Sequence, residues 1–231
     1  MKRFYKTVSV VENSGAWQVT LDGRAIKTVK GAPQTVPTNA LAQALAREWD
    51  AQGDKIDPTS LPMRDMADYA LDVVSETRPD VAGKLVAYAD TDTLLYRADP
   101  DAPLYARQQE VWEPILTAFV AREGVSLKRM SGIMLTSQDE WSLANLRAKL
   151  EVLDPFALTG LEAMTSLAAS LTIGMSAMEA GADALALWEA ASLEEEWQVQ
   201  QWGRDEEAED RRAKRTRDFL RAAEFVRLSM R

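Results

Sequence analysis

Residues 17–29 read WQVTLDGRAIKTV, in which two runs of β-forming residues flank an Asp-Gly pair. Asp-Gly in this setting is typical of a tight hairpin turn, because both residues tolerate the positive φ that the turn requires. Another β-rich run, residues 5–11, precedes them and ends in turn-forming residues at 13–15. The sequence therefore predicts a small antiparallel meander with strands at 5–11, 17–21 and 25–29.

A helix is expected directly after the predicted strands. Pro37 ends the strand pattern, and Thr38 or Asn39 can cap a helix over residues 40–52. The apolar residues of this segment recur at helical spacing, so one face of the helix can cover the sheet.

Helix dominates the rest of the sequence. Helical patterns are separated there by glycine, proline and aspartate breaks, and the one over 155–180 could be interrupted at Gly160. Two short β-rich runs, 91–97 and 125–130, could pair with each other or extend the first sheet. The expected helices are 62–75, 104–122, 137–153, 155–180, 183–202 and 205–227.

These patterns predict an α+β protein. A small antiparallel β-rich N-terminal domain with one covering helix is expected over residues 1–60, followed by a mainly helical domain over residues 61–231. The 231-residue chain is 46% hydrophobic and 27% charged, which is ordinary for a globular protein that buries one substantial core or two small ones.

Charge and composition narrow the function classes. The formal charge of −9 and pI near 4.8 argue against a nucleic-acid partner, because such binding needs a basic footprint. A basic or neutral partner suits the chain better. Cysteine and histidine are both absent, which removes disulfides, thiol nucleophiles, the commonest general base and most zinc sites.

The chain shows no sequence pattern for export or membrane insertion. Residues 1–6 are not followed by an apolar segment, and no long arginine-rich amphipathic presequence is present. The most apolar run, residues 161–180, is interrupted by polar residues and is too polar for a membrane span. A buried helix is the expected structure of that run.

Residues 193–203 read LEEEWQVQQWG and have the character of a contact surface. On a helix, Glu194, Gln198 and Gln201 share one face, and an apolar row with Leu193 and Trp197 lies beside it. Tryptophan is enriched at binding hot spots, because it offers a large area and one donor. The alternative interpretation is a pair of core tryptophans beside a solvated glutamate face.

Four aspartates suggest a different function. Asp68, Asp72, Asp90 and Asp92 could hold a divalent metal, since clustered carboxylate oxygens suit magnesium or calcium. Helix capping would also explain them, and neither a calcium-binding loop nor a phosphate-binding or dinucleotide-binding glycine pattern is present. A carboxylate-dependent or metal-dependent enzyme of unknown substrate is the alternative function.

Short motifs spread over nearly the whole chain point to a known family. They are RFYK at 3–6, LDGRAIKT at 21–28, AREWDAQ at 46–52, DTDTLLYR at 90–97, Gln109 with WEP at 112–114, and LEEEWQVQQWG at 193–203. Together and in this order, they resemble the assembly chaperones that bind the α subunit of the F-type ATP synthase catalytic head.

The resemblance implies a molecular chaperone and no enzyme, with no cofactor and no metal. Such a protein would bind the free α subunit and shield its β-binding surface until the β subunit replaces it. The family's C-terminal acidic motif matches Glu194 and Glu195, with Gln198 and Trp202 beside them, and these four residues are the expected partner-binding site. A lasting subunit or scaffold is a third possible function.

The resemblance also carries expectations about structure and location. It implies a β-rich N-terminal domain and a helical C-terminal domain, which agrees with the patterns above. Trp49, Asp92 and Arg97 lie in matching motifs, and we expect them to hold the fold. Family members in mitochondria carry a presequence, so a bacterial cytoplasm is the expected location of this chain, and the net negative charge favours a monomer.

Overall fold

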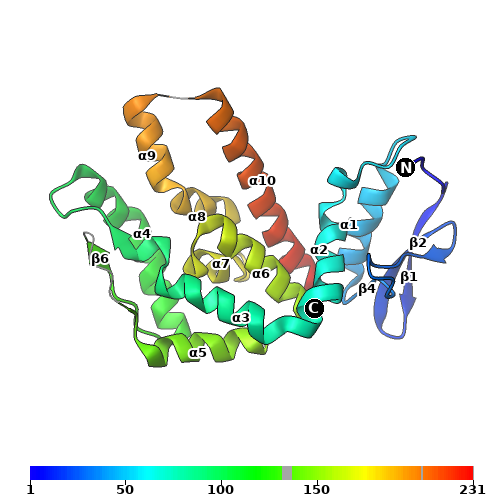
Figure 1. Ribbon diagram of the computed structural model, residues 1–231, viewed down its shortest axis with the longest axis horizontal. Coiled ribbons are helices and arrows are strands. Elements are labelled where there is room, and N and C mark those ends of the chain that lie inside the picture. The colour runs from blue at the N-terminus through cyan, green and yellow to red at the C-terminus, as the bar shows by residue number, and fades with distance from the viewer. Residues whose placement is uncertain (132–136, 204, 231) are drawn as a thin grey trace. The chain divides into compact units, whose positions relative to one another are not determined.

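The computed structural model describes residues 1–131, 137–203 and 205–230 (Figure 1). The chain forms two compact units, each built from separate stretches of sequence. One consists of Met1–Arg78, Asp154–Gly160 and Glu224–Arg231, and the other of Pro79–Leu153 and Leu161–Ala223. The domain boundary predicted between residues 60 and 61 stays a prediction.

The first unit contains a four-stranded antiparallel sheet. Strand β1 (Val8–Asn13) pairs with β2 (Ala16–Leu21), which also pairs with β3 (Arg24–Ala25) and β4 (Thr35–Val36). The turn between β2 and β3 has positive φ at Asp22 and Gly23, 48° and 77°, as a tight hairpin requires. The expected antiparallel arrangement is confirmed.

The third predicted strand, residues 25–29, is shorter than expected. Asp72 draws the chain away from the sheet after Ala25: Thr28 Oγ1 donates to one of its carboxylate oxygens at 2.6 Å, and the Lys30 N–H donates to the other at 2.9 Å. Residues 28–30 are therefore held by Asp72 and by a local backbone turn, in which the Thr28 N–H donates to the Ala32 oxygen at 2.8 Å, instead of by pairing with β2.

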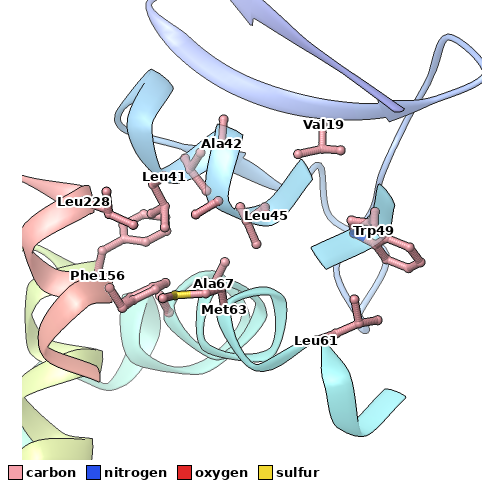
Figure 2. Close-up of a cluster of buried hydrophobic side chains, with 14 of the residues drawn as sticks. Val19, Leu41, Ala42, Leu45, Trp49, Leu61, Met63, Ala67, Phe156 and Leu228 are labelled. Atoms are coloured by element: carbon pink, nitrogen blue, oxygen red, sulfur yellow. The ribbon is translucent and has the colours of Figure 1, made fainter. Parts of the chain in front are cut away.

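Helix α1 (Asn39–Asp50) packs on β1 and β2, as expected. It begins after Thr38, whose side chain accepts a hydrogen bond from the Leu41 N–H. Leu41, Leu45 and Trp49 are buried and belong to the same apolar cluster as Val19 of β2 (Figure 2). This cluster is the core of the first unit.

Helix α2 (Pro62–Tyr69) contributes Met63 and Ala67 to the same core (Figure 2). A short 3-10 helix (Pro58–Ser60) precedes α2, and a π-helical turn (Ala70–Val74) joins it to α3 (Ser75–Asp90). The expected helix over residues 62–75 is thus present, and α3 is kinked just after it at Thr77, which has a φ of −120°.

Most of the second unit is helical. Its short strands β5 (Tyr96–Arg97) and β6 (Met130–Ser131) form a parallel pair, so the two β-rich runs meet each other and not the first sheet. None of the described helices is both long enough and apolar enough to cross a membrane. The remaining elements of the chain are the 3-10 helix Thr93–Leu95, α4 (Pro103–Glu123), α5 (Glu140–Glu151), α6 (Pro155–Ala168), α7 (Leu171–Ala177), α8 (Ala184–Ala191), α9 (Leu193–Trp202) and α10 (Glu206–Ser229). Of these, α6 begins in the first unit and α10 ends in it.

Two of the expected helices are each divided into two, at positions that the sequence did not indicate. The segment 155–180 is divided at Ala169, which has a φ of 49°, and Ser170 caps α7 by accepting from the Ile173 N–H. Gly160, the break suggested by the sequence, lies inside α6. The segment 183–202 is divided at Ser192, the residue between α8 and α9.

Candidate partner-binding site

Helix α9 is poorly buried for a helix of a globular protein. Of its ten residues only Leu193 is buried. Trp202 is 81% exposed, and Trp197 is half-buried. An amphipathic helix normally buries a whole apolar stripe, which α9 does not do. Because Trp202 is exposed, the interpretation of both tryptophans as core residues is wrong for Trp202.

Glu194 lies in the first turn of α9 and is held from the side by α4. Gln108 Nε2 donates to Glu194 Oε1 at 2.7 Å. Burial raises the pKa of Glu194 above its usual 4.5, and the hydrogen bond from Gln108 opposes this rise. The structure therefore presents an oriented, half-buried carboxylate.

Gln108 is itself fully buried and fixed at both ends of its amide. Its Oε1 accepts from the Ala98 N–H at 2.8 Å, while its backbone oxygen accepts from Arg97 Nη1 at 2.8 Å. Sequence reasoning missed Gln108, although the neighbouring Gln109 was part of a matching motif. The only sign of its role is its position one helical turn before Trp112.

Trp49, Asp92 and Arg97 are all buried, as expected for residues that hold the fold. The guanidinium of Arg97 lies 5.2 Å from the centre of the Trp112 ring and pairs with Glu113 at 3.2 Å. The side chain is therefore committed to contacts within this chain.

Glu195, Gln198 and Trp202 line one groove beside α10, which we call the α10 groove. Val199 and Ala208 add apolar surface to it. Glu194 lines neither this groove nor the next, because consecutive helical residues point about 100° apart. The structure thus brings three of the four predicted residues together and turns the fourth towards α4.

A second groove lies along another face of α9, beside α4 and α8, and we call it the α4 groove. Leu193, Trp197 and Gln200 line it from α9, with Val111 of α4 and Ala186 of α8. Helical spacing placed Leu193 and Trp197 on one row, but it could not show that α4 and α8 complete a hollow there.

Three arginines in the N-terminal half of α10 form ion pairs with glutamates of this chain. Arg215 pairs with Glu195 at 2.7 Å, and Arg212 pairs with Glu196. Arg211 pairs with Glu207 of its own helix. These arginines therefore link α10 to α9 and stabilise α10 itself.

The four aspartates of the alternative enzyme hypothesis are engaged by donors of this chain. Asp68 accepts from Gln34 and Arg64, and Asp72 binds residues 28–30 as described above. These two lie in the first unit, whereas Asp90 and Asp92 lie in the second. Within the described ranges, no three acidic side chains are grouped so that they could share a metal ion.

Burial of Glu194 has a consequence for stability. Its raised pKa means that the folded state binds a proton at Glu194 more tightly than the unfolded chain does. Ionisation of Glu194 therefore lowers the free energy of unfolding. This loss is absent below pH 4.5 and grows as the pH rises through the folded-state pKa. Glu194→Gln removes that cost and should therefore raise Tm at pH 7.

Thermal unfolding of both proteins at pH 7, 6 and 5 measures this difference. The gain should shrink as the pH falls towards 4.5. Glu12→Gln, at an exposed strand position, is the control for loss of one negative charge. A Glu194→Gln variant that is less stable at pH 7, or whose gain is the same at every pH, would contradict the expectation.

Comparisons with known proteins point to one family. The model of the ATP12 chaperone protein family matches residues 2–120. Protein atp12 of Schizosaccharomyces pombe, a mitochondrial protein, is 25% identical over 221 residues, which is 90% of this chain and 76% of that protein.

Solved structures give the same result. Atp12 from Paracoccus denitrificans, solved also as an aspartate-to-lysine mutant, is 35% identical, with a TM-score of 0.94 over 99% of this chain and 98% of that one. The Atu1473 protein from Agrobacterium tumefaciens is 33% identical, with a TM-score of 0.92 over 100% of this chain and 86% of that one. The chain is a member of the ATP12 chaperone protein family.

Proposed function

We propose that this protein is an assembly chaperone of the F-type ATP synthase, which binds the free α subunit of the catalytic head and shields its β-binding surface. It does this without cofactor, metal or chemical turnover, in a bacterial cytoplasm and as a monomer when alone. Support comes from membership of the ATP12 chaperone family and from the acidic motif on α9.

The observation that carries the proposal is the exposed surface of α9. It combines an oriented, half-buried carboxylate at Glu194 with the exposed ring of Trp202. A carboxylate with restricted access to water binds a guanidinium or a backbone N–H more strongly than a fully solvated one. Trp202 adds the large apolar contact that binding hot spots need.

Size-exclusion chromatography of the protein mixed with separately expressed α and β subunits tests this function. We expect co-migration with α and not with β. Addition of β to the complex should then release the protein, because β takes the surface that the chaperone covers. Retention of β alone or of neither subunit would contradict the proposal, and a lasting three-protein complex would indicate a scaffold instead.

Charge reversal on α9 tests the site. Glu194→Lys or Glu195→Lys should weaken binding of α by about tenfold or more, because each places a cation where the partner offers one. Glu12→Lys makes the same charge change at an exposed strand position and is the matched control. If all three variants fold and bind α equally well, these carboxylates are not the site.

A further inference from the structure

Helix α9 is bordered by hollows on two of its faces. The α4 groove has a volume of about 450 Å³ and the α10 groove about 420 Å³. The two grooves share no residue of α9: the first is lined by Leu193, Glu196, Trp197 and Gln200, and the second by Glu195, Gln198, Val199 and Trp202. The helix is thus a ridge between two grooves.

Contacts within this chain leave most of that ridge uncovered. Only Leu193 of α9 is buried, and α9 contacts α4 and α8. In Figure 1, α9 (orange) rises from the end of α8, and the beginning of α10 runs in the opposite direction beside it. Helices of about ten residues are marginal without tertiary packing, so cover from a partner would stabilise α9.

The charges along the two grooves show which kind of partner fits. The arginines that line them are all neutralised: Arg107 pairs with Glu110, and Arg211, Arg212 and Arg215 pair with glutamates as described above. Glu189 of the α4 groove and Glu209 of the α10 groove have no ion pair with any residue that the structure describes. Each groove is lined by equal numbers of arginines and acidic residues, but the lining charges that no described ion pair compensates are negative in both.

Apolar side chains form the remaining lining. Val111 and Ala186 accompany Trp197 in the α4 groove, and Val199 and Ala208 accompany Trp202 in the α10 groove. A partner must therefore supply apolar side chains for the lining together with basic groups for the unpaired glutamates. The net charge of −9 acts in the same direction.

We propose that the partner grips α9 from both sides, and that basic side chains flanking apolar ones enter the α4 groove and the α10 groove together. The inference rests on the proposed function, since the partner is taken to be the α subunit. It adds the α4 groove, which the acidic motif does not include, and it specifies a basic and apolar surface on the partner.

Filling each groove separately tests two-sided binding. Ala186→Arg fills the α4 groove and Ala208→Arg the α10 groove, each with a bulky cation. Ala213→Arg makes the same change at an exposed position of α10 outside both grooves and is the matched control. Affinity for the α subunit is measured by biolayer interferometry, after circular dichroism and thermal unfolding have shown that each variant folds.

Both groove variants should bind α about tenfold or more weakly than wild type, and the control should bind within about twofold, as is usual for positions outside an interface. Glu189→Lys and Glu209→Lys should each weaken binding severalfold, with the loss largest at low salt. Glu12→Lys should leave the affinity unchanged.

Several outcomes would overturn the proposal. An effect of Ala208→Arg without one of Ala186→Arg would mean one-sided binding, with the proposed function intact. Normal binding by both groove variants would remove the grooves from the interface and also leave the function standing. A homodimer that both variants dissociate would assign the grooves to a second copy of this chain. Absence of wild-type binding to α would overturn the proposed function together with this inference.

Discussion

Trp112→Ala is expected to lower the free energy of unfolding by about 3–5 kcal/mol, the cost of removing a large aromatic side chain from a packed core. Trp112 is fully buried, and its indole Nε1 donates to the Ala190 oxygen at 2.7 Å. The substitution would leave a cavity and would remove the indole hydrogen bond to the Ala190 carbonyl at the end of α8. It would therefore destabilise the C-terminal end of α8, which α9 directly follows.

Urea unfolding followed by circular dichroism measures this change. Trp141→Ala is the matched control, because it removes the same side chain from a position that is 65% exposed. We expect the control to change stability by about 0.5 kcal/mol or less, as is usual for surface substitutions. Equal midpoints for the two variants would contradict the burial of Trp112.

Asp92→Ala should have an effect of similar size for a different reason. The carboxylate is fully buried and accepts from the Leu94 N–H at 3.0 Å and from the Thr172 N–H at 2.8 Å. Its removal leaves both buried donors without a partner, at about 1–3 kcal/mol each. The substitution would therefore detach the start of α7 from the segment that precedes β5.

The same unfolding measurement distinguishes this role from simple helix capping. Asp183→Ala removes a carboxylate that caps α8 at an exposed position, and it should cost about 1 kcal/mol. Asp92→Asn should recover part of the stability lost in Asp92→Ala, because its amide oxygen can accept one of the two N–H bonds. An Asp92→Ala variant that loses no more stability than Asp183→Ala would show that burial adds nothing.

The β-hairpin could be predicted from sequence because its signals are local. The positive φ values at Asp22 and Gly23 are a property of those two residues. The shortened third strand could not be predicted, because Asp72, which holds Thr28, lies 44 positions away. A carboxylate so far along the chain leaves no trace in a local pattern.

Some helix breaks could likewise be predicted from local residues, and others could not. Pro155 and Gly124 mark helix ends that their own backbone preferences produce, and these were predicted. The break at Ala169 was missed, because alanine has no preference for a φ of 49°. A Cβ on Gly174 would overlap the Thr165 side chain, so the close approach of α6 and α7 requires glycine at this position.

The residues of the candidate site could be predicted from the sequence, but the directions of their side chains could not. Residue spacing placed Glu194 and Gln198 on one helical face, whereas Gln108 holds Glu194 towards α4 and Gln198 lines the α10 groove. Helical periodicity gives the angle between two side chains but not the neighbours they meet.

Sequence by itself determined the α+β class, the hairpin, most of the helices and the segment that carries the acidic and aromatic residues. Those features follow from backbone preferences and hydrophobic periods that act within a few residues. Only the tertiary structure decided that α9 stays largely uncovered, that a buried glutamine orients Glu194, and that grooves border the helix on two faces. These features depend on α4, α8 and α10, which are brought together by burial of apolar surface across distant parts of the chain.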